Sequence, residues 1–244
     1  MLSNFLYEFS EEIDGIIHVG AHTGQEVDQY SKYKNKIILF EPQKDIFNEL
    51  IQNVNNQKNV KCYNFALGSK NEKKAIFKSE GNKGLSSSIL SPELHLLVQP
   101  NISFTDTEEI QIKRFDSLNI DTLNFLTLDV QGFELEVLKG FGNELEKVEF
   151  IFTEINTKYL YKDNALVGDI DEYLKEYNFI RIYTNIDCFN YFGDAFYIKK
   201  TNKKYKKNFL KKIINRINIS NYYLYINKLL YPKKIIKSII RSNK

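Results

Sequence analysis

The sequence predicts an α/β protein with a mostly parallel, twisted sheet, helices on both of its faces and a basic helical tail. Three observations lead to this prediction. Short apolar runs alternate with amphipathic stretches from residue 16 to residue 198, small and polar residues follow the apolar runs directly, and basic residues crowd the C-terminal end. Regular alternation of strands and helices is typical of parallel sheets, because each parallel connection needs a crossover.

The first part of the chain is expected to form three strands with helices between them. We expect strands at 16–19, 36–40 and 60–65, and helices at 25–33 and 44–54. The helix at 44–54 is indicated most strongly, because its apolar residues recur at spacings of three and four. These residues are Ile46, Phe47, Leu50, Ile51 and Val54.

The second part continues the alternation after a less regular stretch. Irregular sequence begins near residues 75–78, and residues 80–107, with two glycines, a run of three serines at 86–88 and two prolines, look like an inserted loop region. Residues 109–115 alternate polar and apolar side chains, as a half-exposed strand does. We expect further strands at 125–130, 148–155, 179–183 and 195–198, and helices at 134–139 and 170–177.

Charge is distributed unevenly along the 244 residues. Residues 201–244 hold thirteen Lys or Arg and no acid, whereas the remainder carries 21 basic and 31 acidic side chains and a net charge of −10. The overall composition, 43% hydrophobic and 27% charged, is that of an ordinary globular protein. The sequence therefore predicts an acidic body at 1–200 and a separate basic tail at 201–244.

The tail also has apolar residues at helical spacing between its lysines and arginines. Basic amphipathic helices bind anionic membrane surfaces, which is one interpretation of residues 203–244. The other is that these helices dock on the body or on a second copy of the chain, giving a homo-oligomer. RNA is a weaker third candidate.

The sequence favours a cytoplasmic protein without a resident metal. No apolar run approaches the length of a membrane span, and the N-terminus lacks the pattern of a secretory signal. Cys62 and Cys188 are too few and too far apart in the chain for a disulfide scaffold or a zinc site. The histidines, His18, His22 and His95, are not expected to converge on a metal.

Residues that can bind a ligand or take part in catalysis collect at the carboxyl ends of the predicted strands, where open α/β sheets bind ligands. Gly20 and Gly24 bracket a turn after the first strand, and Glu41 ends the second strand 21 positions after Gly20. A carboxylate there can accept both hydroxyls of a ribose, so the pair indicates an adenosine-containing cofactor. His22 stands where a dinucleotide-binding G-x-G-x-x-G motif needs glycine, and the lysine of a phosphate-binding P-loop is absent.

Four segments resemble the successive signatures of FkbM-type methyltransferases. They read VGAHTGQE, LFEPQKDIFNEL, NFALGSKNEKKAIF and LTLDVQGFELEVLKG, and the last is the most specific. The resemblance covers about residues 13–200 and implies a Rossmann-like class I methyltransferase fold that uses S-adenosylmethionine. It also implies that residues 1–200 are the cofactor-binding catalytic domain, with 80–107 as its irregular insertion.

The resemblance also implies roles for single residues around the cofactor. Gly20, His22 and Gly24 would line its methionine part. Glu41 would hold the ribose, Pro42 and Ala66 would border the adenine, and Asp129 would face the sulfonium centre. His18 is included among the cofactor residues, although the family often has Asp at this position, which leaves the contact to the amino-acid part of the cofactor open.

Two carboxylates are candidates for the catalytic base. Asp129 and Glu154 end neighbouring predicted strands, so both can project into one pocket, where their proximity raises the pKa of one of them. We expect one of them to take the proton of the acceptor hydroxyl, with Glu134 as a lesser candidate. The structural alternatives are that Asp129 caps the following helix and that Glu154 pairs with a lysine.

The resemblance implies O-methylation of a sugar, glycan precursor or related small molecule, as in surface-polysaccharide or antibiotic biosynthesis. Aromatic residues can form a wall for such an acceptor, and the candidates are Tyr159, Tyr161, Tyr191 and Phe192. Nucleic acid is not expected as a substrate, because the chain has no Pro-Pro-aromatic or Pro-Cys motif and its body is acidic. A non-catalytic nucleoside-binding protein and a nicotinamide-dependent dehydrogenase remain the alternatives.

Overall fold

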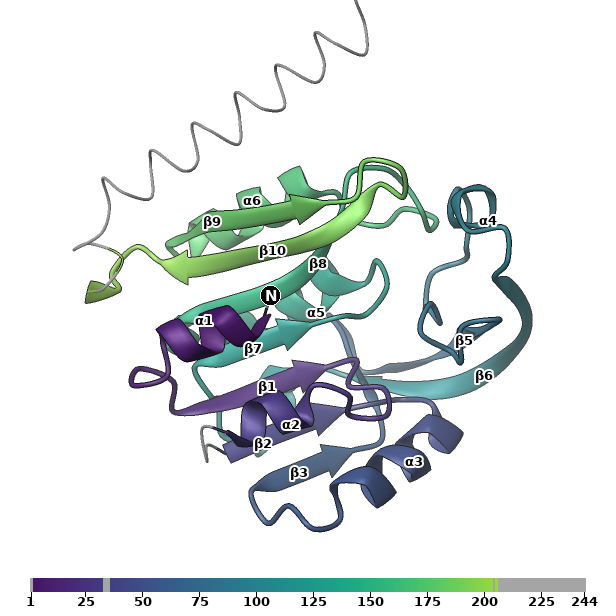
Figure 1. Cartoon of the computed structure of the whole chain (residues 1–244). Coiled ribbons are helices and arrows are strands. Elements are labelled where there is room, and N and C mark those ends of the chain that lie inside the picture. The colour runs from purple at the N-terminus through teal and green to yellow at the C-terminus, as the bar shows by residue number, and fades with distance from the viewer. Residues whose placement is uncertain (1, 33–35, 204, 206–244) are drawn as a thin grey trace, which may run out of the picture. The chain divides into compact units, whose positions relative to one another are not determined.

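The computed structural model describes residues 2–32, 36–203 and 205 (Figure 1). The chain divides into two units, residues 1–200 and residues 201–244. The helices expected in the tail, and its contact with a membrane or a second subunit, fall almost entirely on residues outside the described ones. All of the described strands belong to the first unit.

The first unit is built on a seven-stranded sheet with the order β3-β2-β1-β7-β8-β10-β9. The central strands β1, β2, β3, β7 and β8 pair in parallel, and β10 is antiparallel to both of its neighbours. The bounds of the strands are Gly15–Val19 (β1), Lys36–Phe40 (β2), Val60–Tyr63 (β3), Phe125–Leu128 (β7), Phe150–Asn156 (β8), Phe179–Ile186 (β9) and Phe192–Lys199 (β10). The predicted fold class, an α/β protein with a mostly parallel sheet, is confirmed.

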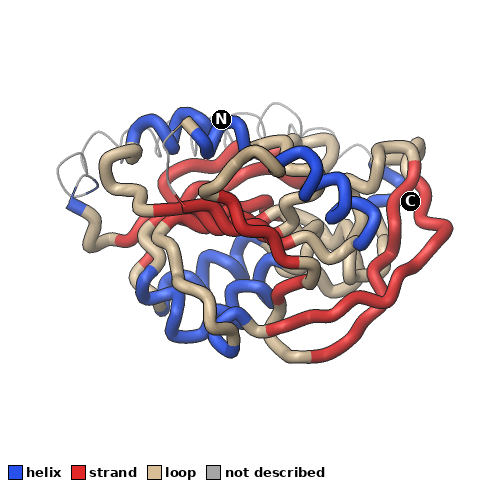
Figure 2. Tube along the Cα trace, turned by 90° about the horizontal axis from the view of Figure 1, so that it is seen from below, coloured by secondary structure: helices blue, strands red, loops and turns tan. Residues whose placement is uncertain are grey.

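Helices cover both faces of this sheet (Figure 2). They are α1 (Leu2–Glu8), α2 (Val27–Ser31), α3 (Lys44–Val54), α5 (Glu134–Phe141) and α6 (Val167–Glu176). Because side chains alternate along a strand, Ile17 of β1 packs in one core with Val137 of α5 and Ile170 of α6. On the other face, Phe5 of α1 stacks on Phe196 of β10. Burial on both faces explains why β1 and β7 are buried at every position.

A second, three-stranded sheet has the order β4-β6-β5, and it overlaps the expected loop region at residues 80 and 103–107. Its strands are Ala66–Leu67 (β4), Glu72–Glu80 (β5) and Ser103–Lys113 (β6), and a short helix, α4 (His95–Val98), lies between β5 and β6. The prediction of an irregular insertion at 80–107 was therefore wrong at its C-terminal end and missed β5. Charge pairs such as Lys73–Glu109 link β5 and β6 of this exposed ribbon, and the strand expected at 109–115 from its polar–apolar alternation corresponds to the C-terminal part of β6.

Some predicted elements are shorter than expected. The helix expected at 25–33 is limited to Val27–Ser31, because residues before it form a turn, and the strand expected at 60–65 ends at Tyr63. Two short 3₁₀ helices, Phe115–Ser117 and Gly142–Lys147, link strands and helices. Among the described residues, no helix is both long and apolar enough to cross a bilayer.

Candidate active site

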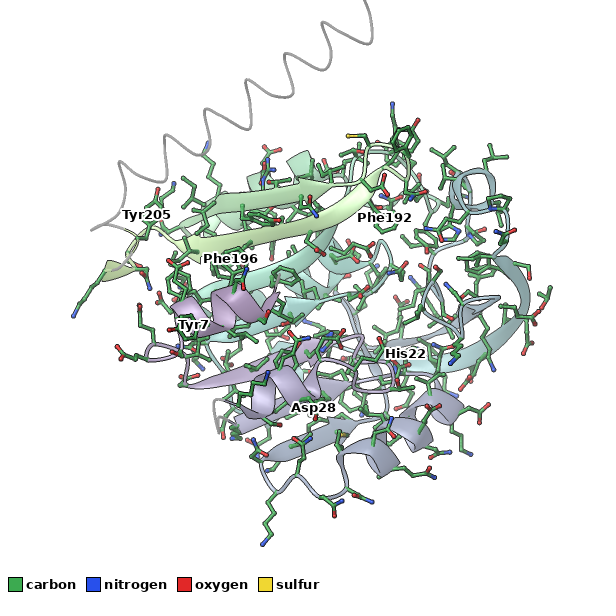
Figure 3. The ribbon with its side chains drawn as sticks, in the orientation of Figure 1. Tyr7, His22, Asp28, Phe192, Phe196 and Tyr205 are labelled. Atoms are coloured by element: carbon green, nitrogen blue, oxygen red, sulfur yellow. The ribbon has the colours of Figure 1, made fainter. Side chains whose placement is uncertain are left out.

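Two cavities that share lining residues lie at the carboxyl ends of the parallel strands. A wide cleft of about 710 Å³ lies over β7, β8 and β10, and a small cavity of about 60 Å³ lies at the ends of β1 and β2. Leu85, Asp129 and Gln131 line both of them. Figure 3 shows His22, after β1, and Phe192, at the start of β10, on this side of the sheet.

The glycines of the first turn are required by the packing of the chain itself. Gly20 has a φ of +83°, and a Cβ atom there would lie 1.8 Å from the carbonyl oxygen of Asp129. Gly24 has a φ of +82°, and its Cβ would lie 2.8 Å from Leu50 of α3. Gly20 lines the small cavity, whereas Gly24 is not among the residues that line either cavity.

Glu41 is the buried carboxylate of the small cavity and is 3% exposed. Its Oε2 accepts a hydrogen bond from the backbone N–H of His22 at 3.1 Å, and its Oε1 accepts one from Gln43 at 2.8 Å. Burial raises the pKa of Glu41 to about 7, although these hydrogen bonds oppose the shift. Pro42 and Ala66 line the same cavity.

His22 joins the first turn to the segment after β5. Its φ is +47°, and its Nε2 donates a hydrogen bond to the carbonyl oxygen of Lys83 at 2.9 Å. Its Nδ1 is buried and has no hydrogen-bond partner among the described residues. Buried polar atoms usually have a hydrogen-bond partner. A polar ligand in the cavity that holds Glu41 could supply this partner to Nδ1 of His22.

His18 lies in β1, is buried and lines the wide cleft instead. Its Nδ1 lies 3.1 Å from the hydroxyl of Tyr30. Burial lowers the pKa of His18 to about 4, so the ring is neutral at physiological pH. Of the predicted cofactor residues, the small cavity thus brings together Gly20, His22, Glu41, Pro42, Ala66 and Asp129.

Asp129 and Glu154 lie in the same cleft, joined by Gln131. The Gln131 amide nitrogen donates to Asp129 Oδ1 and to Glu154 Oε2, both at 2.8 Å. The amide is oriented by Tyr161, whose hydroxyl lies 3.0 Å from Gln131 Oε1. Sequence reasoning noted Gln131 only as part of a motif. Its role depends on Tyr161, which is thirty positions away, and on a backbone φ of +52°.

The two carboxyl groups cannot both ionise easily. Burial in the cleft is the largest cause that raises the pKa of Glu154 well above its ordinary value, and the charges of Asp129 and Glu134 add to the shift. Limited hydration also raises the pKa of Asp129, while hydrogen bonds from Gln131 and Glu154 oppose the shift. This pattern favours a protonated Glu154 that donates to an ionised Asp129 at neutral pH.

Neither structural alternative for these two residues is seen. The first turn of α5 follows Phe133, and no side chain caps it. Among the ion pairs of residues 2–32, 36–203 and 205, none involves Glu154.

Glu134 supports the loop that carries Asp129 and lines neither cavity. It is fully buried, and its Oε1 accepts the backbone N–H groups of Val130 and Gly132 at 3.2 and 3.1 Å. Burial, with the charge of Asp129, raises its pKa to about 7. These contacts favour a positioning role for Glu134 over a role as base.

The aromatic residues expected around an acceptor divide into two groups. Tyr161 and Phe192 line the cleft, but Tyr159 and Tyr191 do not. His95 of α4, which sequence reasoning placed in an irregular loop, also lines the cleft and is 2% exposed. Its ring packs against Tyr161, with 5.3 Å between the centroids.

Comparisons with known proteins find a family model and curated relatives that are methyltransferases. Residues 18–181 match the family model described as the Methyltransferase FkbM domain. The chain is 22% identical over 176 residues to the 2-O-methyltransferase NoeI of Sinorhizobium fredii, covering 68% of this chain and 72% of NoeI. It is 29% identical over 159 residues to the hexuronic acid methyltransferase AglP of Haloferax volcanii, covering 65% of this chain and 62% of AglP.

Solved structures with the same fold include two methyltransferases. The FkbM methyltransferase of Methylobacillus flagellatus aligns with a TM-score of 0.51 at 12% identity, over 76% of this chain and 43% of that one. The magnesium protoporphyrin IX methyltransferase ChlM of Synechocystis, solved with bound SAM, aligns with a TM-score of 0.50 at 9% identity, over 82% of this chain and 76% of that one. The chain thus spans less than two thirds of AglP and of the Methylobacillus protein.

The family match covers more than half of the chain and includes the strands that carry Glu41, Asp129 and Glu154. The chain therefore belongs to the FkbM methyltransferase family, whose cofactor is S-adenosylmethionine.

Proposed function

We propose that this chain is an S-adenosylmethionine-dependent O-methyltransferase that methylates a hydroxyl group of a sugar or glycan precursor. The observation that carries the proposal is that Asp129 lines both cavities, so that a cofactor in one and an acceptor in the other would share one wall. The names of two relatives, a 2-O-methyltransferase and a hexuronic acid methyltransferase, support a sugar hydroxyl as the acceptor.

The residues of the small cavity fit the cofactor chemically. Glu41 would accept the ribose hydroxyls, and Pro42 and Ala66 would border the adenine. Gly20 and the unpaired Nδ1 of His22 would contact the methionine part. Gly24 would shape the turn after β1. His18 would approach the methionine part of the cofactor from the wide cleft. The bound cofactor supplies an electrophilic methyl group on a sulfonium sulfur.

The protein's own contribution is alignment and proton removal. Asp129, ionised and held by Gln131, would accept the proton of the acceptor hydroxyl as its oxygen bonds to the methyl carbon. Protonated Glu154 would donate to Asp129 and keep its carboxylate oriented. This assignment favours Asp129 over Glu154 as the base.

Titration calorimetry of the full chain tests the cofactor first. We expect S-adenosylhomocysteine to bind and NAD not to bind, since the turn lacks a dinucleotide motif. The variant Glu41→Ala should weaken S-adenosylhomocysteine by about tenfold or more, because two ribose hydroxyls lose a charged acceptor. Binding of NAD alone would support the dehydrogenase.

Methyl transfer then tests the base. Asp129→Asn should lower kcat by roughly 10²–10⁴-fold and leave S-adenosylhomocysteine affinity within a few fold, because a neutral amide cannot accept the proton. Glu154→Gln should have a smaller effect, since a side-chain amide can still donate to Asp129. The reverse order of the two effects would assign the base to Glu154, and binding without any transfer would support the nucleoside-binding alternative.

We also propose that the basic tail, residues 201–244, holds the enzyme at an anionic membrane surface on the cytoplasmic side. Its thirteen basic residues and absence of acids support this proposal.

A further inference from the structure

The wall of the cleft farthest from the Glu41 cavity is formed by β8, β9 and β10. Glu154 of β8 pairs in register with Asp194 of β10, and Asp194 pairs with Asn185 of β9. Asp187 follows β9 and lines the same wall. None of Glu154, Asp187 and Asp194 lines the small cavity, so this wall is available to the acceptor and not to the adenosine.

With Glu154 protonated, the negative charge of this wall comes from Asp187 and Asp194. Three backbone and side-chain N–H groups of Phe189 and Asn190 donate to Asp187, and they lower its pKa. Partial burial, followed by the charge of Asp129, raises the pKa of Asp194. Glu26 and Asp129 add two further acids on the side of the cleft next to β1 and β7.

Among residues 2–32, 36–203 and 205, neither lysine nor arginine lines the cleft. Its two histidines do not supply positive charge, because burial lowers the pKa of both His18 and His95. His95 is 2% exposed, and its Nδ1 has no hydrogen-bond partner among the described residues. This neutral ring nitrogen is therefore free to bond with an acceptor in the cleft.

We infer that the acceptor carries no negative charge beside the hydroxyl to be methylated, and that a sugar with a protonated amino group is preferred over its N-acetylated and carboxylated counterparts. An ammonium group can form charge-assisted hydrogen bonds with Asp194 and Asp187, whereas a carboxylate or phosphate would be repelled by them. The inference rests on the proposed function and specifies its acceptor class.

The test measures binding of three matched sugars to the full chain saturated with S-adenosylhomocysteine, at neutral pH, by saturation-transfer NMR. The sugars are the methyl glycosides of glucosamine, N-acetylglucosamine and glucuronic acid, which differ in charge on one scaffold. We expect the amino sugar to bind about tenfold more tightly than the N-acetyl sugar, and the glucuronide to bind most weakly.

Two variants test whether the preference for the amino sugar comes from the acidic wall of β8, β9 and β10. Asp194→Asn, which keeps the shape of the side chain, should reduce the preference for the amino sugar several-fold. Asp194→Lys should reverse the order of the amino sugar and the glucuronide. Glu172→Lys makes the same change of charge at an exposed position of α6 and should leave the order unchanged.

Tight binding of the glucuronide by the unaltered chain, or no binding of the amino sugar, overturns this inference. The inference is also overturned if Glu172→Lys changes the order of the sugar affinities as much as Asp194→Lys does, because the preference would then come from overall charge. The proposed function fails separately, if S-adenosylhomocysteine does not bind or no methyl transfer to any acceptor occurs.

Discussion

Glu41 is buried, although in the proposed function its carboxylate must be ionised to bind the ribose of the cofactor. Its pKa of about 7 in the folded chain lies above the ordinary carboxyl value of 4.5, so the folded state binds the proton more tightly than the unfolded state. This group's contribution to folding stability is therefore greatest below pH 4.5 and is lost as the pH rises through 7.

Cofactor affinity should show the opposite trend. If ionised Glu41 accepts the ribose hydroxyls, the Kd of S-adenosylhomocysteine rises by up to about tenfold for each pH unit below 7. Calorimetry between about pH 5.5 and pH 8 measures this, and Glu41→Gln serves as the control whose affinity should vary less. Equal pH dependence in both proteins would show that another group titrates.

At the scale of elements, the contact between β1 and β7 determines the site. The loops after these strands meet where Gly20 touches the carbonyl of Asp129, so a side chain at Gly20 would push the loop that carries the base. We expect Gly20→Ala to destabilise the fold by about 2 kcal/mol or more, through both the clash and its positive φ.

Gly168 of α6 is the matched control, because a Cβ there has no atom within 4 Å. Gly168→Ala should raise stability by up to about 1 kcal/mol through helix propensity. Denaturant unfolding of the two variants measures both effects. A neutral Gly20→Ala would mean that the loops after β1 and β7 can separate without cost.

The elements also show what sequence could predict. The strand ending at Phe40 and the helix at 44–54 have clear apolar patterns, and their predicted bounds agree with the structure. In the ribbon, the C-terminal part of β6 was predicted from the alternation at 109–115, whereas β5 and the start of β6 carry many exposed residues without a clear apolar pattern. At the site, Glu41 and Asp129 could be predicted as residues that follow strands. The roles of Gln131 and Asp194 depend on partners that are distant in sequence.

At the scale of the whole molecule, the chain joins an acidic body to a basic tail. If the tail binds anionic lipid, the full chain should sediment with phosphatidylglycerol vesicles at low salt, and a chain ending at Lys200 should stay in the supernatant. Raising the salt should release the full chain, because the attraction is electrostatic. Equal sedimentation of both chains, or sedimentation with neutral phosphatidylcholine vesicles, would contradict the membrane role.

The hydrogen bond from His22 to Lys83 closes the small cavity with the segment that follows β5. The cavity of about 60 Å³ would have to widen to hold a nucleoside, so we expect this segment, here called the strap, to move away from the turn when the cofactor binds or leaves. The rate of opening would then limit how fast spent cofactor is exchanged, and turnover at saturating acceptor would depend on the strap as well as on the methyl transfer.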